Sequence, residues 1–245
     1  DRDYPIPGDL PLVTMDNALR DCDRLICFGG DGTILHAARL VGARDIPMLG
    51  INTGTMGFMA ELESNELELL PRILSEQVPT EPRMMIHVAV KRNGRVLCED
   101  NALNDAVITK GAVARVISLT VQCDHVEAMH FDGDGIVIAT PTGTTAYSMS
   151  AGGPIVEPTA RNIIVTPICA HAIGVRSLVL MKDRIVTTRV GRIGTRSAYL
   201  SVDGGKAIRL SANDEVVTTA SRRSIHLIKI KDASYYSTLN QKFQQ

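Results

Sequence analysis

The sequence has no excess of charge of either sign. Its 245 residues include 26 Lys and Arg and 27 Asp and Glu, which gives a formal net charge of -1. A chain without a basic excess has no general attraction for nucleic acid or for an anionic membrane, so neither is expected as a partner. Any affinity for phosphate groups has to be local.

Paired cysteines and long apolar runs are also missing. The five cysteines form no CxxC pair, which argues against a disulfide framework and a zinc site and favours a reducing, cytoplasmic setting. No apolar run approaches the roughly 20 residues that span a bilayer, and no charged-then-apolar leader opens the chain. The first residue is not Met, so we expect a trimmed or partly unobserved N-terminus.

The composition present is that of a globular protein, with 44% hydrophobic and 22% charged residues. Up to about residue 82, short apolar runs alternate with helical patterns, as in βαβ units. Residues 1–82 are therefore expected to form a Rossmann-like α/β domain with a parallel sheet, although no first strand is recognisable before residue 14. The expected strands lie at 24–30 and 46–52, and the expected helices at 15–20, 33–41 and 63–74, the last with Ser64 as N-cap.

The pattern changes after Pro82. Short runs rich in β-branched residues are separated by turns such as RNGR and VDGGK, which predicts an all-β domain, a β-sandwich, over residues 83–231. Residues 232–245 are weakly helical and are expected to pack back onto the first domain. The strands are expected at 84–92, 95–100, 104–110, 116–122, 135–140, 197–202, 206–211, 214–220 and 224–230.

Residues 25–33, LICFGGDGT, place a glycine turn between an apolar run and a helix. Backbone N–H groups and the positive end of a helix dipole suit phosphate oxygens, and glycine lets a ligand approach the backbone closely. A pure phosphate anchor would avoid the charge of Asp31, which suggests that a metal, a proton or a hydroxyl group also enters. Taken alone, a tight turn in which Asp31 caps the helix explains GGDGT better.

Two later segments add weight to a nucleotide site. NTGTMGF, residues 52–58, also follows a strand, so both glycine turns are expected at the carboxyl edge of one parallel sheet. Residues 132–158 offer many hydroxyl groups and backbone amides around a single aromatic residue, Tyr147, and can bind a sugar and a base; a long structural turn is the alternative. Phe58 fits a core position as well as a ring stacked on a base, and VDGG at 202–205 alone fits a hairpin turn.

In combination, GGDGT, the Asn-acid pair at 104–105, TPTGTTAYSMSAGGP at 140–154 and VDGG resemble the NAD kinase family, in order and spacing, over about residues 23–230. The resemblance implies transfer of the γ-phosphate of ATP, or of phosphate from inorganic polyphosphate, to the 2′-hydroxyl of the adenosine ribose of NAD, giving NADP. It also implies an α/β domain beside a β-sandwich, Mg²⁺ or another divalent cation bound with the nucleotide, and a homodimer or homotetramer.

The resemblance also implies roles for individual residues. Asp31 falls on the family's catalytic aspartate, and Asp105 stands where the family has a glutamate, which is one methylene longer. No residue is assigned as a metal ligand. The phosphate- or ATP-binding positions correspond to Gly29, Gly30, Gly32 and Thr33, and the NAD-binding positions to Phe58, Asn104, Asp105, Asp134, Thr145, Ala146, Tyr147, Ser150 and Asp203.

Two other functions fit part of the pattern. A lipid kinase of the diacylglycerol or sphingosine type shares GGDGT, but its acceptor is an apolar lipid alcohol, which requires an apolar cleft. Residues 141–153 are instead dominated by Thr, Ser and Gly. A non-catalytic NAD-binding sensor would explain the long loop but would not explain Asp31 and its glycine turn.

Overall fold

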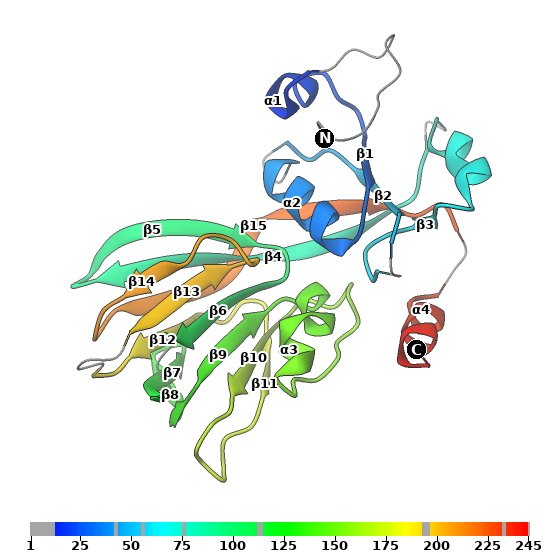
Figure 1. The fold of residues 1–245 in the computed structure, drawn as a ribbon. Coiled ribbons are helices and arrows are strands. Elements are labelled where there is room, and N and C mark those ends of the chain that lie inside the picture. Colours follow the sequence, from blue (N-terminus) through cyan, green and yellow to red (C-terminus); the bar gives the residue numbers. More distant parts are fainter. Residues whose placement is uncertain are drawn as a thin grey trace.

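The computed structural model describes residues 13–41, 44–54, 57–74, 77–111, 115–192, 197–231 and 234–244. These residues form one nine-stranded and one six-stranded sheet. Helices α1 (Met15–Ala18) and α2 (Asp31–Val41) lie in the N-terminal part, and α3 (Tyr147–Ser150) and α4 (Tyr235–Phe243) lie apart from them (Figure 1). Within the described ranges no helix is long and apolar enough to cross a membrane. Most of the region before residue 14, where a first strand was expected, lies outside them.

The N-terminal part is the expected βαβ unit. Strand β1 (Leu25–Phe28) pairs in parallel with β2 (Met48–Asn52), and α2 (Asp31–Val41) connects them. Because the two strands are parallel neighbours, both glycine turns lie at one edge of the sheet, as predicted. The buried face of α2 packs into an apolar core beside this sheet. The remaining elements of this part are α1 (Met15–Ala18), β3 (Leu62–Glu63) and the 3₁₀ helix η1 (Leu67–Leu74).

The helix expected at 63–74 is wrong in type and in start. Residue 63 still belongs to β3, Ser64 lies in the following turn, and the helix that begins at Leu67 is a 3₁₀ helix. Pro71 lies inside it and has no backbone N–H to donate, which prevents a regular α-helical hydrogen-bond ladder. The apolar spacing indicated a helix, while Pro71 was the signal in the sequence against a regular α-helix.

The C-terminal part is a β-sandwich. Its two sheets enclose a single large apolar core, with buried residues from strands of both. Sequence reasoning missed four strands: β8 (Val126–Gly133), β10 (Asn162–Ile168), β11 (Leu178–Met181) and β12 (Val186–Val190). The others are β4 (Thr80–Arg92), β5 (Arg95–Ala102), β6 (Asp105–Lys110), β7 (Ile117–Cys123), β9 (Gly135–Ala139), β13 (Ala198–Val202), β14 (Ile208–Leu210) and β15 (Glu215–Ile228).

Two long strands join the two parts of the molecule. The two strands expected at 214–220 and 224–230 are one strand, β15, which pairs with β4 along its length with an irregularity between Ala220 and Ser224. Near its end, Leu227 pairs in parallel with Met48 of β2. The nine-stranded sheet therefore continues from the sandwich into the α/β part (Figure 1).

The last helix, α4 (Tyr235–Phe243), follows β15 and lies near the α/β part. The amino group of Lys242 lies 5.1 Å from the centre of the Phe58 ring. This contact places α4 beside the second glycine turn.

Candidate functional site

Asp31 opens α2, but its carboxylate does not cap that helix. Oδ2 accepts a hydrogen bond from the backbone N–H of Phe58 at 2.8 Å, and Oδ1 accepts one from that of Met59 at 3.0 Å. The carboxylate therefore joins the first glycine turn to the second. An ionised carboxylate can accept about four hydrogen bonds, so this half-buried group keeps acceptor capacity for a ligand.

The first glycine turn combines one structural glycine with two that border open space. A Cβ atom at Gly29, where φ is +151°, would overlap the side chain of Thr33, and the Gly29 N–H donates to Ile51 O at 2.9 Å. A Cβ at Gly30 or Gly32 would meet no described atom within 4 Å. A ligand can therefore approach the backbone at Gly30 and Gly32, at the N-terminus of α2.

The Asn-acid pair lies at the start of β6 and is held by Asp203, in the turn that follows the neighbouring strand β13. The carboxylate of Asp203 accepts the backbone N–H groups of Leu103 at 2.8 Å, Asn104 at 2.8 Å and Asp105 at 3.1 Å. In the described part of the chain, the buried Oδ1 atom of Asn104 has no hydrogen-bond partner. A buried amide oxygen without a donor is costly, and a ligand hydroxyl or amino group would satisfy it.

Asp105 is a buried acid whose pKa is raised. Its side chain is 6% exposed, and burial, followed by the nearby charge of Asp203, raises its pKa from 3.8 to about 7. Burial also raises the pKa of Asp203, although its three amide partners and Arg39 act in the opposite direction. Because its pKa is raised, the carboxyl of Asp105 takes up a proton more readily than an exposed aspartate does, and in the protonated form it can donate a hydrogen bond.

The loop at 140–150 folds against this pair. The Thr140 N–H donates to Asn104 O at 2.8 Å, and a Cβ at Gly143 would overlap the same carbonyl group. The buried hydroxyls of Thr140, Thr144 and Ser148 bond within the protein and hold the loop together. Residues of η2 (Thr142–Thr145), of α3 (Tyr147–Ser150) and Ala146 between them remain accessible. They include four predicted NAD-binding residues: Thr145, Ala146, Tyr147 and Ser150.

Asp134 lies apart from the other predicted site residues. It precedes β9 and pairs with Lys110 Nζ at 2.7 Å, whereas the loop at 140–150 follows the other end of that strand. Five extended residues span about 17 Å. Within one chain, Asp134 therefore does not join the group around Asn104.

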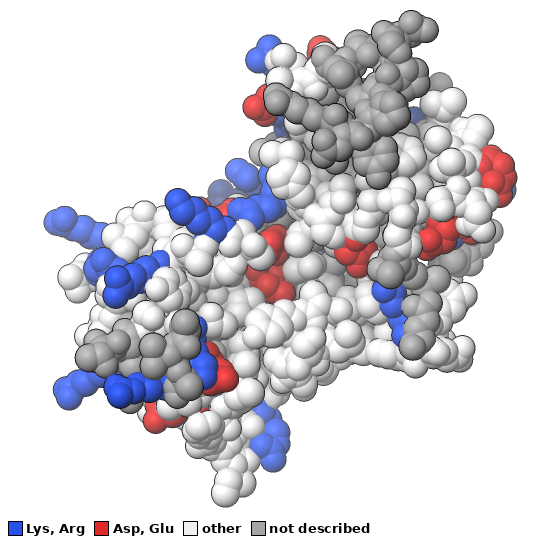
Figure 2. Space-filling view, viewed as in Figure 1, with Lys and Arg blue, Asp and Glu red and all other residues white. Residues whose placement is uncertain are grey.

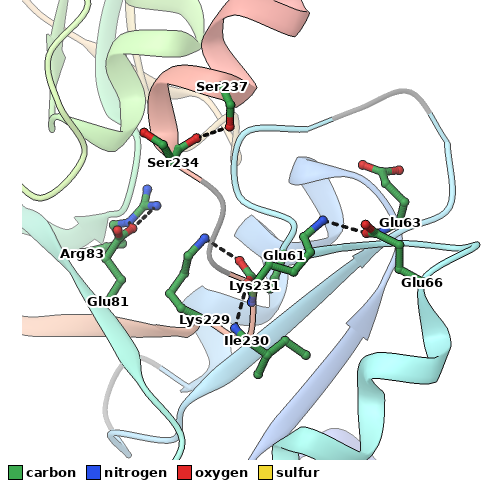
Figure 3. Close-up of polar contacts among 10 residues, drawn as sticks. All are labelled: Glu61, Glu63, Glu66, Glu81, Arg83, Lys229, Ile230, Lys231, Ser234 and Ser237. Carbon is green, nitrogen blue, oxygen red and sulfur yellow. Dashed lines mark hydrogen bonds and ion pairs between the residues drawn. The ribbon is translucent and has the colours of Figure 1, made fainter.

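A polar cavity of about 340 Å³ adjoins the second glycine turn, and sequence reasoning missed it. Gly57, Phe58, Arg83 and Tyr235 are among its lining residues. Figure 3 shows the ion pairs beside it: Arg83 with Glu81, Lys229 with Glu61, and Lys231 with Glu66. The signal available in the sequence was the pair Lys229 and Lys231 at the end of an apolar run, because residues i and i+2 of an extended segment point to the same side.

Contacts between these segments bring them into one region. Leu103 packs in the same apolar cluster as Ile34 of α2 and Met59. Arg83 Nη1 donates to Thr142 Oγ1 at 3.4 Å, which connects the cavity to the loop at 140–150. Figure 2 shows acidic side chains in the hollow between the α/β part and the sandwich, while Lys and Arg gather over the far end of the sandwich.

The described residues include no group of three or more His, Cys, Asp or Glu side chains that could hold a metal ion. The carboxylate of Asp31 offers oxygen atoms, the donors that a divalent cation prefers, beside the first glycine turn.

Comparison with known families matches both parts of the chain. Residues 9–78 match the ATP-NAD kinase N-terminal domain, and residues 103–230 match the ATP-NAD kinase C-terminal domain. The NAD kinase of Acetivibrio thermocellus is 36% identical over 231 residues, covering 94% of this chain and 80% of that protein. The NAD kinase of Symbiobacterium thermophilum is 40% identical over 227 residues, covering 91% and 78%.

Two solved structures share the fold. Yeast NADH kinase complexed with NADH has a TM-score of 0.85 at 27% identity, covering 94% of this chain and 68% of that chain. An NAD kinase from Archaeoglobus fulgidus in complex with ATP has a TM-score of 0.73 at 27% identity, covering 91% and 83%.

Proposed function

Because this chain belongs to the NAD kinase family, we propose that it transfers the γ-phosphate of ATP, or phosphate from polyphosphate, to the 2′-hydroxyl of the adenosine ribose of NAD, giving NADP. The observation that carries the proposal is the carboxylate of Asp31, which two backbone amides hold beside a glycine turn open to a ligand. A donor phosphate and an acceptor hydroxyl can meet there.

Asp31 acts on the acceptor hydroxyl. A carboxylate is too weak a base to deprotonate a ribose hydroxyl in the ground state. In a loose, metaphosphate-like transition state the bond to the incoming oxygen forms late, so the hydroxyl proton becomes acidic late and passes to Asp31 only then. The amides of Phe58 and Met59 fix the carboxylate, which lets it aim the hydroxyl oxygen at the phosphorus.

The glycine turn serves the donor. Gly30 and Gly32, where an added Cβ would meet no described atom within 4 Å, lie at the positive end of α2, where non-bridging phosphate oxygens are stabilised. Gly29 and Thr33 shape this turn. A divalent cation, which we expect to be Mg²⁺, would offset the phosphate charge beside Asp31.

The acceptor NAD is proposed to lie along the second turn and the loop at 140–150. Asn104 Oδ1 needs a hydrogen-bond donor, and the hydroxyl and amino groups of NAD are donors of that kind. Asp105 can contact a hydroxyl in either protonation state. Phe58, whose ring also contacts the amino group of Lys242, supplies an aromatic side chain, while Thr145, Ala146, Tyr147 and Ser150 line the accessible side of the loop.

An assay with NAD, ATP and Mg²⁺ that measures NADP tests the proposal, with polyphosphate as a second donor and diacylglycerol as a second acceptor. NADP formation with either donor supports it. Phosphorylation of diacylglycerol without NADP formation would favour the lipid kinase. Tight NAD binding without any phosphate transfer would favour the sensor.

We also propose a cellular location and an oligomeric state for this protein. The five cysteines are free, which suits a reducing cytoplasm. A homodimer or homotetramer is expected, and light scattering on the purified protein measures which one forms.

A further inference from the structure

The turn at Val202–Gly205 is a tight connection between β13 and β14. Asp203 and Gly204 both have positive φ, +48° and +66°, and the Gly205 N–H donates to Val202 O at 2.8 Å. Aspartate tolerates the left-handed region better than most residues, and the turn fits the hairpin interpretation of VDGG. The turn geometry alone does not explain the direction of the Asp203 side chain.

That side chain reaches across to the start of β6. The Asp203 carboxylate accepts three consecutive backbone N–H groups, from Leu103, Asn104 and Asp105, and the Asp203 N–H donates to Asp105 O at 2.9 Å. Hydrogen bonds to an ionised acceptor are stronger than those between neutral groups. One residue thus fixes the backbone of three others that lie about a hundred positions earlier in the chain.

Asn104 is held from its other side as well. Its carbonyl oxygen accepts the Thr140 N–H, and the backbone of Gly143 packs directly against it. The backbone N–H and C=O of Asn104 are therefore both occupied, while the buried Oδ1 has no partner among the described residues. The side-chain amide is the part of Asn104 left for a ligand.

The same turn also contacts the helix that carries Asp31. Arg39, in the last turn of α2, donates from Nη1 to Val202 O at 3.3 Å and from Nη2 to Asp100 Oδ2 at 2.7 Å. A Cβ at Gly205 would lie 2.5 Å from Arg39 Nη1. The turn thus lies between the helix of the proposed phosphate site and the segment of the proposed NAD site.

We propose that Asp203 is a positioning residue for NAD: its carboxylate contacts no substrate, but holds the backbone of residues 103–105 so that the Asn104 side chain meets NAD. This inference rests on the proposed function. Without the carboxylate, the three backbone N–H groups lose their hydrogen-bond acceptor, so the backbone of Asn104 shifts. The side-chain amide of Asn104 is then displaced from the position in which it binds NAD.

Two variants remove the carboxylate in different ways. Asp203→Gly adopts positive φ without strain, and Asp203→Asn keeps one acceptor oxygen. Asp124→Gly is the matched control. Asp124 also has positive φ (+50°), its Oδ1 accepts the Ile185 N–H at 2.9 Å, and its own N–H donates to Ile185 O, in the β7–β8 hairpin away from the site.

The readouts are the dissociation constant of NAD by calorimetry and the separate values of KM and kcat. We expect Asp203→Gly to raise the dissociation constant and the KM for NAD about tenfold, with the KM for ATP within about twofold of the native value. Asp203→Asn should give a smaller rise. Asp124→Gly should lower the melting temperature and leave both KM values unchanged. A purely structural role for Asp203 would behave like this control, lowering only the folded fraction, and that result overturns the proposal.

A double-mutant cycle separates positioning from direct contact. If Asp203 acts through Asn104, adding Asp203→Gly to Asn104→Ala should weaken NAD binding less than threefold further. A further tenfold loss would show that Asp203 acts independently of Asn104, and overturns the proposal. Because these binding constants do not depend on turnover, a native chain that binds NAD but forms no NADP rejects the kinase function and leaves the positioning result standing.

Discussion

A Cβ atom at Gly57 would overlap Oδ1 of Asp31, although the two residues belong to different glycine turns. Gly57 also precedes the two residues whose backbone N–H groups hold that carboxylate. The second turn therefore closes directly over Asp31, and the absence of a side chain at Gly57 lets it do so.

Gly57→Ala should displace the carboxylate of Asp31 without removing it. Misplacement of a reacting group by about 1 Å can cost about 100-fold in rate, so we expect kcat for NADP formation to fall by about that factor. The KM for NAD should change little. Gly54→Ala is the control in the same turn, because a Cβ there meets no described atom within 4 Å. Equal activity of the two variants would contradict this role of Gly57.

Asp31→Asn should retain the fold and much of the NAD affinity while kcat falls by about 10²–10⁴-fold, the usual contribution of a general base. Asparagine has one acceptor oxygen, so one of the two backbone amides also loses its partner. Asp23→Asn, an exposed aspartate ahead of β1, is the control. Near-native kcat in Asp31→Asn would rule out both the proton-accepting and the aiming role.

Gly30→Ala and Gly32→Ala test the phosphate site. The added methyl groups meet no described protein atom within 4 Å, so both variants should fold with unchanged melting temperatures. If phosphate approaches this backbone, the KM for ATP should rise roughly tenfold while the dissociation constant of NAD stays the same. Gly174→Ala, also in open space but in the loop between β10 and β11, should change neither. An unchanged KM for ATP would show that the phosphates of ATP do not bind at this glycine turn.

The pH dependence of stability should show the buried acid Asp105. Its folded pKa is raised to about 7 from 3.8, so between these values the folded chain holds a proton that the unfolded chain has released. Stability should therefore fall as pH rises from about 4 to about 7, by up to about 1.4 kcal/mol per pH unit from this group. Asp203, whose pKa is also raised, acts in the same direction.

Urea unfolding at several pH values measures this slope. Asp105→Asn cannot release a proton, so its stability should fall less steeply over the same range. The exposed Asp183→Asn serves as the control. If the native chain and Asp105→Asn show equal slopes, the buried acid does not titrate as described.

The sequence by itself was enough to predict the order of the two parts, most of their strands and the family. The apolar runs at 24–30 and 46–52, which lead into the two glycine turns, were enough to predict two parallel strands with both turns at one edge, because strands that alternate with helices run parallel. The residues of GGDGT and of the loop at 140–154 were enough to identify the NAD kinase family, which the domain matches confirm.

Only the tertiary structure decided what the carboxylates face. Asp31 could have capped its own helix, yet its carboxylate oxygens accept hydrogen bonds from backbone N–H groups of the second glycine turn. Asp203 could have faced solvent from a hairpin turn or a ligand, yet it holds the backbone of Asn104. Hydrophobic periodicity specifies which face of an element is buried. It carries no information about which distant N–H group meets a given carboxylate, because that pairing exists only after the sheets have packed and desolvation has made an unpaired polar group costly.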